Sequence, residues 1–167
     1  MAQSKVRVLD THIHLAVDWH SGLGGGGGLP NGWLPGEPEA FRRNWTEDGL
    51  LALSAQGKHN FEVVGTVFVE CANEPPEAEA QWTLSMAEDP KSTVKAVVAH
   101  IPVPEGAAAV KAFLDKLRDK DSGRLPPRLK GGRVVLLGDP MPSPDFCLSN
   151  TYLEGLSELQ KSGKQLY

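Results

Sequence analysis

Four short apolar segments rich in β-branched residues alternate with helical patterns, and this alternation is the feature that most limits the folds open to the chain. The four segments run over residues 6–15, 61–71, 94–103 and 130–137. Each of them predicts a β-strand. Strands that alternate with helices imply parallel pairing, because a right-handed helical crossover joins parallel neighbours. The sequence therefore predicts an α/β fold built on a parallel sheet.

The helical patterns follow the strands in order. Their predicted bounds are residues 39 or 46 to 54, 76–88, 107–119 and 150–163. The third pattern is the clearest, with apolar residues at i, i+3, i+4 and i+7, namely Val110, Phe113, Leu114 and Leu117. In the fourth, we expect Asn150 to cap the helix and Leu153, Leu156 and Leu159 to form its apolar side.

Two parallel architectures fit this pattern, an open doubly wound sheet and a closed eight-stranded barrel. Residues 22–38 contain five consecutive glycines and three prolines, which predicts a mobile loop or lid. No GxxxxGK[ST] turn follows the first strand, and the glycine run lies too far past that strand and leads into prolines instead of a helix, so a nucleotide-binding site is not indicated. The periodicity alone does not choose between the two architectures.

Charge and composition exclude several classes of partner. Lysine and arginine number 17 against 21 acidic residues, and basic residues form no stripe interleaved with aromatics, so we expect no nucleic-acid partner. No apolar run approaches the ~20 residues of a membrane span, so we expect no membrane partner either. Cys71 and Cys147 are too few for a disulfide framework and form no CxxC pair. These features predict a cytoplasmic protein with reduced thiols.

The first strand carries the residues with the clearest chemistry. Asp10, His12 and His14 lie two residues apart, and the period of two in a strand predicts that they share one face with Val6 and Val8. Imidazole nitrogens are favoured ligands for zinc and related ions, so an HxH pair at a strand end predicts a metal site. The alternative is that the two histidines are half-buried polar residues with local partners.

The segment VLDTHIHL resembles the DxHxH opening of the amidohydrolase superfamily, in particular the amidohydrolase-related branch of lactonases and carboxylate-removing enzymes. The segments FVEC, EAEAQWTLSMAEDP, VVAHIPV and LKGGRVVLL resemble the successive βα units of that branch, in the same order. The resemblance implies a TIM-barrel-type (β/α)8 fold, of which this chain contains only the first four βα units. It also implies that His12 and His14 bind the catalytic metal, zinc in the first place and manganese as an alternative.

Three further residues are candidates for substrate contacts, and for Glu70 and His100 a contact with the metal is an alternative. Glu70 and His100 lie near the carboxyl ends of the second and third strands, where a barrel places its active-site rim. Arg133 follows two glycines in the fourth strand, and the family resemblance implies that it holds a substrate carboxylate by bidentate hydrogen bonds. For all three, a structural role such as an internal ion pair remains open.

The resemblance implies a hydrolase that activates water for attack on a lactone, ester or amide of a small carboxylated substrate. The family's remaining ligands and its catalytic aspartate follow later strands, so no catalytic base can be named in this chain. One alternative is a decarboxylase on the same scaffold. The other is a non-catalytic truncated fragment, in which the first and fourth strands are unpaired sheet edges that associate with another chain or a second copy.

Overall fold

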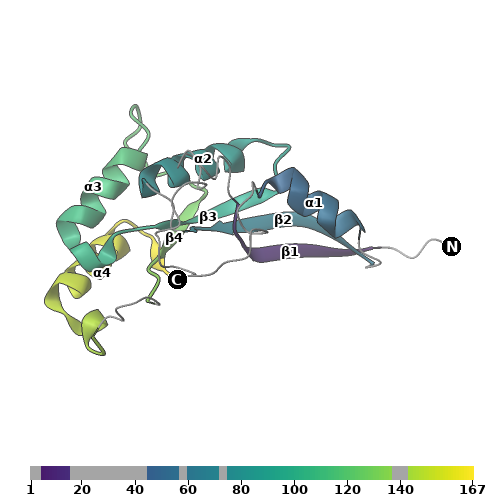
Figure 1. Ribbon diagram of the computed structural model, residues 1–167. Coiled ribbons are helices and arrows are strands. Elements are labelled where there is room, and N and C mark those ends of the chain that lie inside the picture. The colour runs from purple at the N-terminus through teal and green to yellow at the C-terminus, as the bar shows by residue number, and fades with distance from the viewer. Residues whose placement is uncertain (1–4, 16–44, 57–59, 72–74, 137–142) are drawn as a thin grey trace.

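The computed structural model describes residues 5–15, 45–56, 60–71, 75–136 and 143–167. These residues form a five-stranded parallel sheet in the order β1-β2-β3-β4-β5 (Figure 1). The strands are β1 (Val6–Ile13), β2 (Phe61–Val69), β3 (Val94–His100), β4 (Leu129–Arg133) and β5 (Gln165–Leu166). Strands that are consecutive in sequence are neighbours in the sheet, as successive βα units require. The predicted α/β class is confirmed, while the predicted loop at 22–38 lies outside the described residues.

Within the described segments, four α-helices and two short 3₁₀ turns connect the strands. They are α1 (Glu47–Gln56), α2 (Pro76–Glu88), η2 (Val103–Glu105), α3 (Ala107–Leu117), η3 (Phe146–Leu148) and α4 (Asn150–Lys161). In Figure 1, α1 and α2 lie along the same side of the sheet, and α3 and α4 pack beyond the end of β3. Within the described residues, no helix has the length and apolar character that a membrane crossing requires.

The prediction of four strands is incomplete. Residues Gln165–Leu166 follow α4 and pair in parallel with Gly131 and Gly132 of β4, which adds a fifth strand. The edges of the described sheet are therefore β1 and β5, and the prediction that the fourth strand is an unpaired edge is wrong. A strand of two residues is too short to show a period of two, which is why the sequence pattern did not reveal it.

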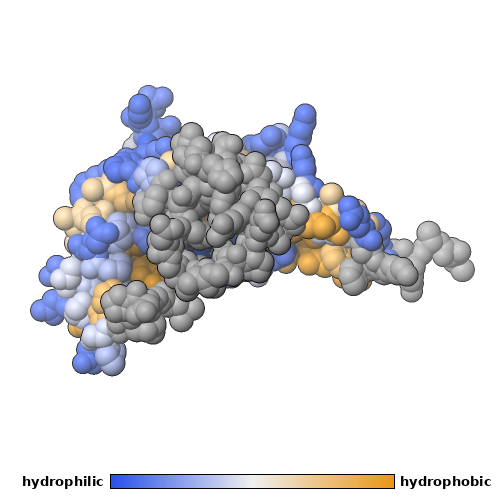
Figure 2. Space-filling view, viewed as in Figure 1, coloured by the Kyte–Doolittle hydropathy of each residue, from blue (hydrophilic) through white to orange (hydrophobic). Residues whose placement is uncertain are grey.

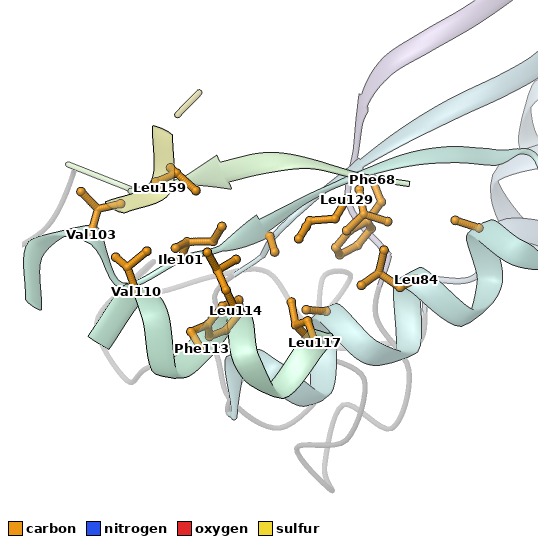
Figure 3. Close-up of a cluster of buried hydrophobic side chains, with 14 of the residues drawn as sticks. Phe68, Leu84, Ile101, Val103, Val110, Phe113, Leu114, Leu117, Leu129 and Leu159 are labelled. Atoms are coloured by element: carbon orange, nitrogen blue, oxygen red, sulfur yellow. The ribbon is translucent and has the colours of Figure 1, made fainter. Parts of the chain in front are cut away.

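The main core lies between the sheet and the helices that cover it. Figure 3 shows Ile101 close to Leu114 of α3, with Phe68 and Leu129 packed further along the sheet. The four apolar residues predicted for the third helix are all buried, so its predicted face is confirmed. On β3, Val97, Val98 and Ala99 are buried in succession, as expected for a parallel strand covered on both faces.

The face that the fourth helix buries is only partly the one predicted, because Leu159 is buried and Leu156 packs against the core but Leu153 does not. Its buried residues are Tyr152, Gly155 and Leu159, whereas Leu153 is exposed. The cause is close packing, since a Cβ at Gly155 would lie 2.2 Å from the backbone oxygen of Val103 in η2. The predicted N-cap is also displaced by one residue. Ser149 caps the helix, and its hydroxyl accepts a hydrogen bond from the backbone N–H of Tyr152 at 3.2 Å.

The first strand is buried only at its carboxyl end. Ile13 and the following Leu15 belong to the core, whereas Val6 and Leu9 are exposed. The apolar residues at the start of β1 are therefore not part of the core. An edge strand has a neighbour on one side only, and among the described residues that neighbour is β2.

Candidate active site at the strand ends

Five polar side chains from four neighbouring strands lie at the carboxyl edge of the sheet. His12 lies near the end of β1 and His14 directly after it, while Glu70 directly follows β2. His100 and Arg133 are the last residues of β3 and β4, and the two are register partners. Parallel strands end at a common edge, so the fold brings together all of the predicted metal and substrate residues. Their roles in binding stay predictions.

Glu70 and Arg133 form the buried centre of this group. The Glu70 side chain is 0% exposed and that of Arg133 is 18% exposed. Arg133 donates from Nε to the Glu70 carboxylate at 2.6 Å and from Nη2 to the Glu70 backbone oxygen at 2.7 Å. Two charge-assisted hydrogen bonds in a rigid fork fix both side chains. The internal ion pair left open as an alternative for Arg133 is thus present.

His100 approaches the same carboxylate from β3. Its Nδ1 lies 3.9 Å from Oε2 of Glu70, while Arg133 binds Oε1. This separation is too long for a direct hydrogen bond but short enough for electrostatic attraction if His100 is protonated. Glu70 therefore lies between two basic side chains, and the His100 ring remains partly exposed at the sheet edge.

The backbone of β2 orients His14. Its Nδ1 donates a hydrogen bond to the backbone oxygen of Val69 at 2.9 Å, which leaves the lone pair on Nε2. The pKa of His14 lies below its ordinary value, because partial burial of the ring disfavours the imidazolium and the charges of Arg133 and His12 add to this effect. A lowered pKa favours the neutral ring, which is the form that binds metals.

His12 lies next to both His14 and Arg133. The centroids of the two imidazole rings are 5.0 Å apart with planes at 81°, and Nε2 of His12 lies 3.5 Å from Nη1 of Arg133. The backbone N–H of His12 donates to the Asp10 carboxylate at 3.1 Å. The register with β2 shifts between Asp10 and Ile13, so the strict alternation predicted for these residues is interrupted there.

The donor set matches part of a metal site. Two imidazoles that share one zinc ion at about 2.0–2.1 Å from each nitrogen place their ring centroids about 5 Å apart. The observed spacing of His12 and His14 agrees with this value, and the Val69 contact selects the required tautomer of His14. The described residues contain no group of three or more histidine, cysteine or acidic residues that could hold a metal ion. They therefore supply two candidate ligands.

Two supports of the site were not predicted from the sequence. One is the Val69 carbonyl, since any residue type supplies a backbone acceptor and the pattern carries no signal for it. The other is Glu79, a buried residue of α2 whose carboxylate accepts hydrogen bonds from the backbone N–H and the thiol of Cys71. This contact ties the chain directly after Glu70 to α2. In the sequence, Glu79 has the pattern of an ordinary charged residue in an amphipathic helix, so its burial was not predicted.

Comparison with known proteins supports the fold of this scaffold. No protein-family model matches the chain, and no curated protein matches it. Among solved structures, it is similar to amidohydrolase 2 from Bifidobacterium longum subsp. infantis, with 18% identity and a TM-score of 0.53. The alignment covers 97% of this chain and 51% of that protein, so the chain spans about half its length. The described α/β sheet thus resembles part of an amidohydrolase TIM barrel.

Proposed function

We propose that this chain forms the part of an amidohydrolase-type hydrolase that carries the first two metal-binding histidines, His12 and His14. The observation that carries the proposal is their position, side by side at the carboxyl edge of a parallel sheet that resembles an amidohydrolase scaffold. Zinc is the expected ion, with manganese as the alternative. The chemistry that such an ion supplies is activation of water and polarisation of a carbonyl oxygen.

The proposed substrate is a small carboxylated molecule with a lactone, ester or amide bond. Two of the three donor-bearing nitrogens of Arg133 are bound to Glu70, and the third, Nη1, faces His12. The partly exposed His100 lies on the other side of Glu70. A substrate carboxylate could therefore contact Nη1 of Arg133 and the His100 ring, while the bond to be cleaved lies toward the two metal-binding histidines.

Zinc binding tests the proposal. We expect the wild-type chain to bind one zinc ion weakly in a calorimetric titration, because two imidazoles leave the other positions of a tetrahedral shell to water. Replacing either ligand, as His12→Ala or His14→Ala, should weaken zinc binding by at least ~10-fold. This is the smallest loss of affinity usual when a residue that only supports a ligand is removed, and the loss of a ligand itself should cost no less. His100→Ala is the matched control and should bind zinc as the wild type does. Equal zinc binding by all four proteins would refute the assignment of the ligands.

Hydrolysis should be slow in this chain even with zinc or manganese added. The described residues supply two candidate metal ligands, and none of these residues is assigned as a catalytic base. The measurement is the hydrolysis of simple lactones by the purified chain and by a His12→Ala, His14→Ala double variant. Two results together would contradict this expectation: one zinc ion per chain remains bound after dialysis, and the chain has activity that the double variant lacks. The site would then be more complete than we propose.

A further inference from the structure

This inference concerns the guanidinium of Arg133 and rests on the proposed function. Nη1 of Arg133 lies 3.5 Å from Nε2 of His12, at the outer limit of a hydrogen bond. On His14, Nδ1 is already bound to the Val69 carbonyl, so the nitrogen open to an ion is Nε2. A permanently charged donor therefore faces one of the two candidate metal ligands.

The guanidinium is held firmly in this position. Its Nε and Nη2 are both bound to Glu70, whose side chain is fully buried. The backbone leading to Arg133 is also fixed, because a Cβ at Gly131 would lie 2.0 Å from the Gln165 oxygen, and one at Gly132 would lie 2.7 Å from Ile101 Cγ1. An arginine is not deprotonated in proteins, so Nη1 can act only as a donor. Arg133 thus places a built-in positive group next to His12.

We propose that Arg133 is an internal competitor of the metal ion at His12. In the His12 tautomer that accepts from Nη1, the lone pair on Nε2 serves either the guanidinium hydrogen or the metal, so an ion can bind Nε2 only when Nη1 leaves it. The ion pair with Glu70 neutralises the charge of Arg133 but keeps Nη1 in place. Arg133 is in this sense a positioning residue that holds Nη1 against His12 and lowers the metal affinity of the histidine pair.

The test is the double variant Glu70→Gln, Arg133→Met. It removes the guanidinium and the carboxylate together, so no buried charge is left unpaired and no carboxylate is set free to become an extra ligand. Methionine fills the space of the unbranched arginine stem. We expect zinc affinity, measured by calorimetry, to rise by about 10-fold over the wild type. Cobalt binding, followed by the visible absorption of the ion, should also be tighter in the double variant than in the wild type. Adding His12→Ala to the double variant should abolish the gain in affinity.

The controls separate this inference from the proposed function. Glu70→Gln alone keeps the guanidinium and should show no gain in zinc affinity. If the double variant does not fold by circular dichroism, Arg133→Lys replaces the fork with a single ammonium and should give a smaller gain, whose absence would refute the competition. Zinc that binds the double variant no more tightly than the wild type, but is lost in His12→Ala, would overturn this inference and keep the proposed function. Absence of zinc binding in every variant would overturn both.

Discussion

Gly155 shows how strongly a single missing side chain can determine packing. The helix α4 approaches η2 so closely that a Cβ at this position would lie 2.2 Å from the Val103 oxygen, a distance that real contacts do not reach. We expect Gly155→Ala to lower the free energy of unfolding by about 1–3 kcal/mol, the usual cost of overpacking. The measurement is urea denaturation followed by circular dichroism.

The matched control is Gly49 in α1, another glycine in a helix. An added Cβ there would meet only Thr46 Oγ1, at an ordinary 3.4 Å. Gly49→Ala should therefore raise the free energy of unfolding by about 0.5–1 kcal/mol, because alanine loses less backbone entropy than glycine when a helix forms. If Gly155→Ala were as stable as Gly49→Ala, the close contact between α4 and Val103 would be disproved.

At the same scale, the sequence predicted which site residues come together but not how they pair. All five residues were predicted to lie near strand ends, because apolar runs mark the strands and polar residues follow them. They are His12, His14, Glu70, His100 and Arg133. The bond between Glu70 and Arg133 joins residues 63 positions apart. Such a pairing depends on side-chain conformations that are fixed only in the folded sheet. A local sequence pattern therefore does not predict it.

Capping of α4 is a testable feature of a single element. The Ser149 hydroxyl accepts the Tyr152 N–H, one of the N–H groups that a helix leaves without a partner at its start. Ser149→Ala should therefore lower the free energy of unfolding by about 0.5–2 kcal/mol. Asn150→Ala, one residue later, serves as the control and should change it by less than about 0.5 kcal/mol. Thermal unfolding of both variants measures the difference, and an equal loss in the two would contradict the assignment of the cap.

The elements themselves were predicted better than their ends. The bounds of α2 match the prediction, because Pro76 opens the helix and Asp89-Pro90 stops it. The predicted strands extend too far, since Leu15, Ile101 and Val103 continue the apolar run after the strand hydrogen bonds stop. Burial without strand pairing has the same sequence pattern as a strand. Hydrophobicity therefore locates an element but does not fix its last residue.

At the scale of the whole molecule, the β1 end of the sheet has an apolar surface. Val6 is 62% exposed and Leu9 is 54% exposed, and β1 is an edge of the described sheet. Figure 2 shows hydrophobic surface gathered over β1 and α1, where Leu53 is also exposed. An exposed edge strand with apolar side chains is a known template for pairing with another chain. The proposal of homo-oligomers through sheet edges follows from these features, with β1 as the contacting edge.

We therefore expect the purified chain to self-associate through β1 as its concentration rises. Leu9→Lys should shift the distribution toward monomers, because a charge on an edge strand opposes pairing with a second copy. The control is Leu148→Lys, where the leucine is 69% exposed but belongs to η3, between β4 and α4, and not to the β1 edge, so the distribution should not change. Sedimentation velocity over a range of concentrations measures both variants beside the wild type. A wild type that stays monomeric throughout, or equal behaviour of the two variants, would exclude β1 as the contact. If Leu9→Lys is monomeric while the wild type and Leu148→Lys associate, the contact lies on the β1 edge.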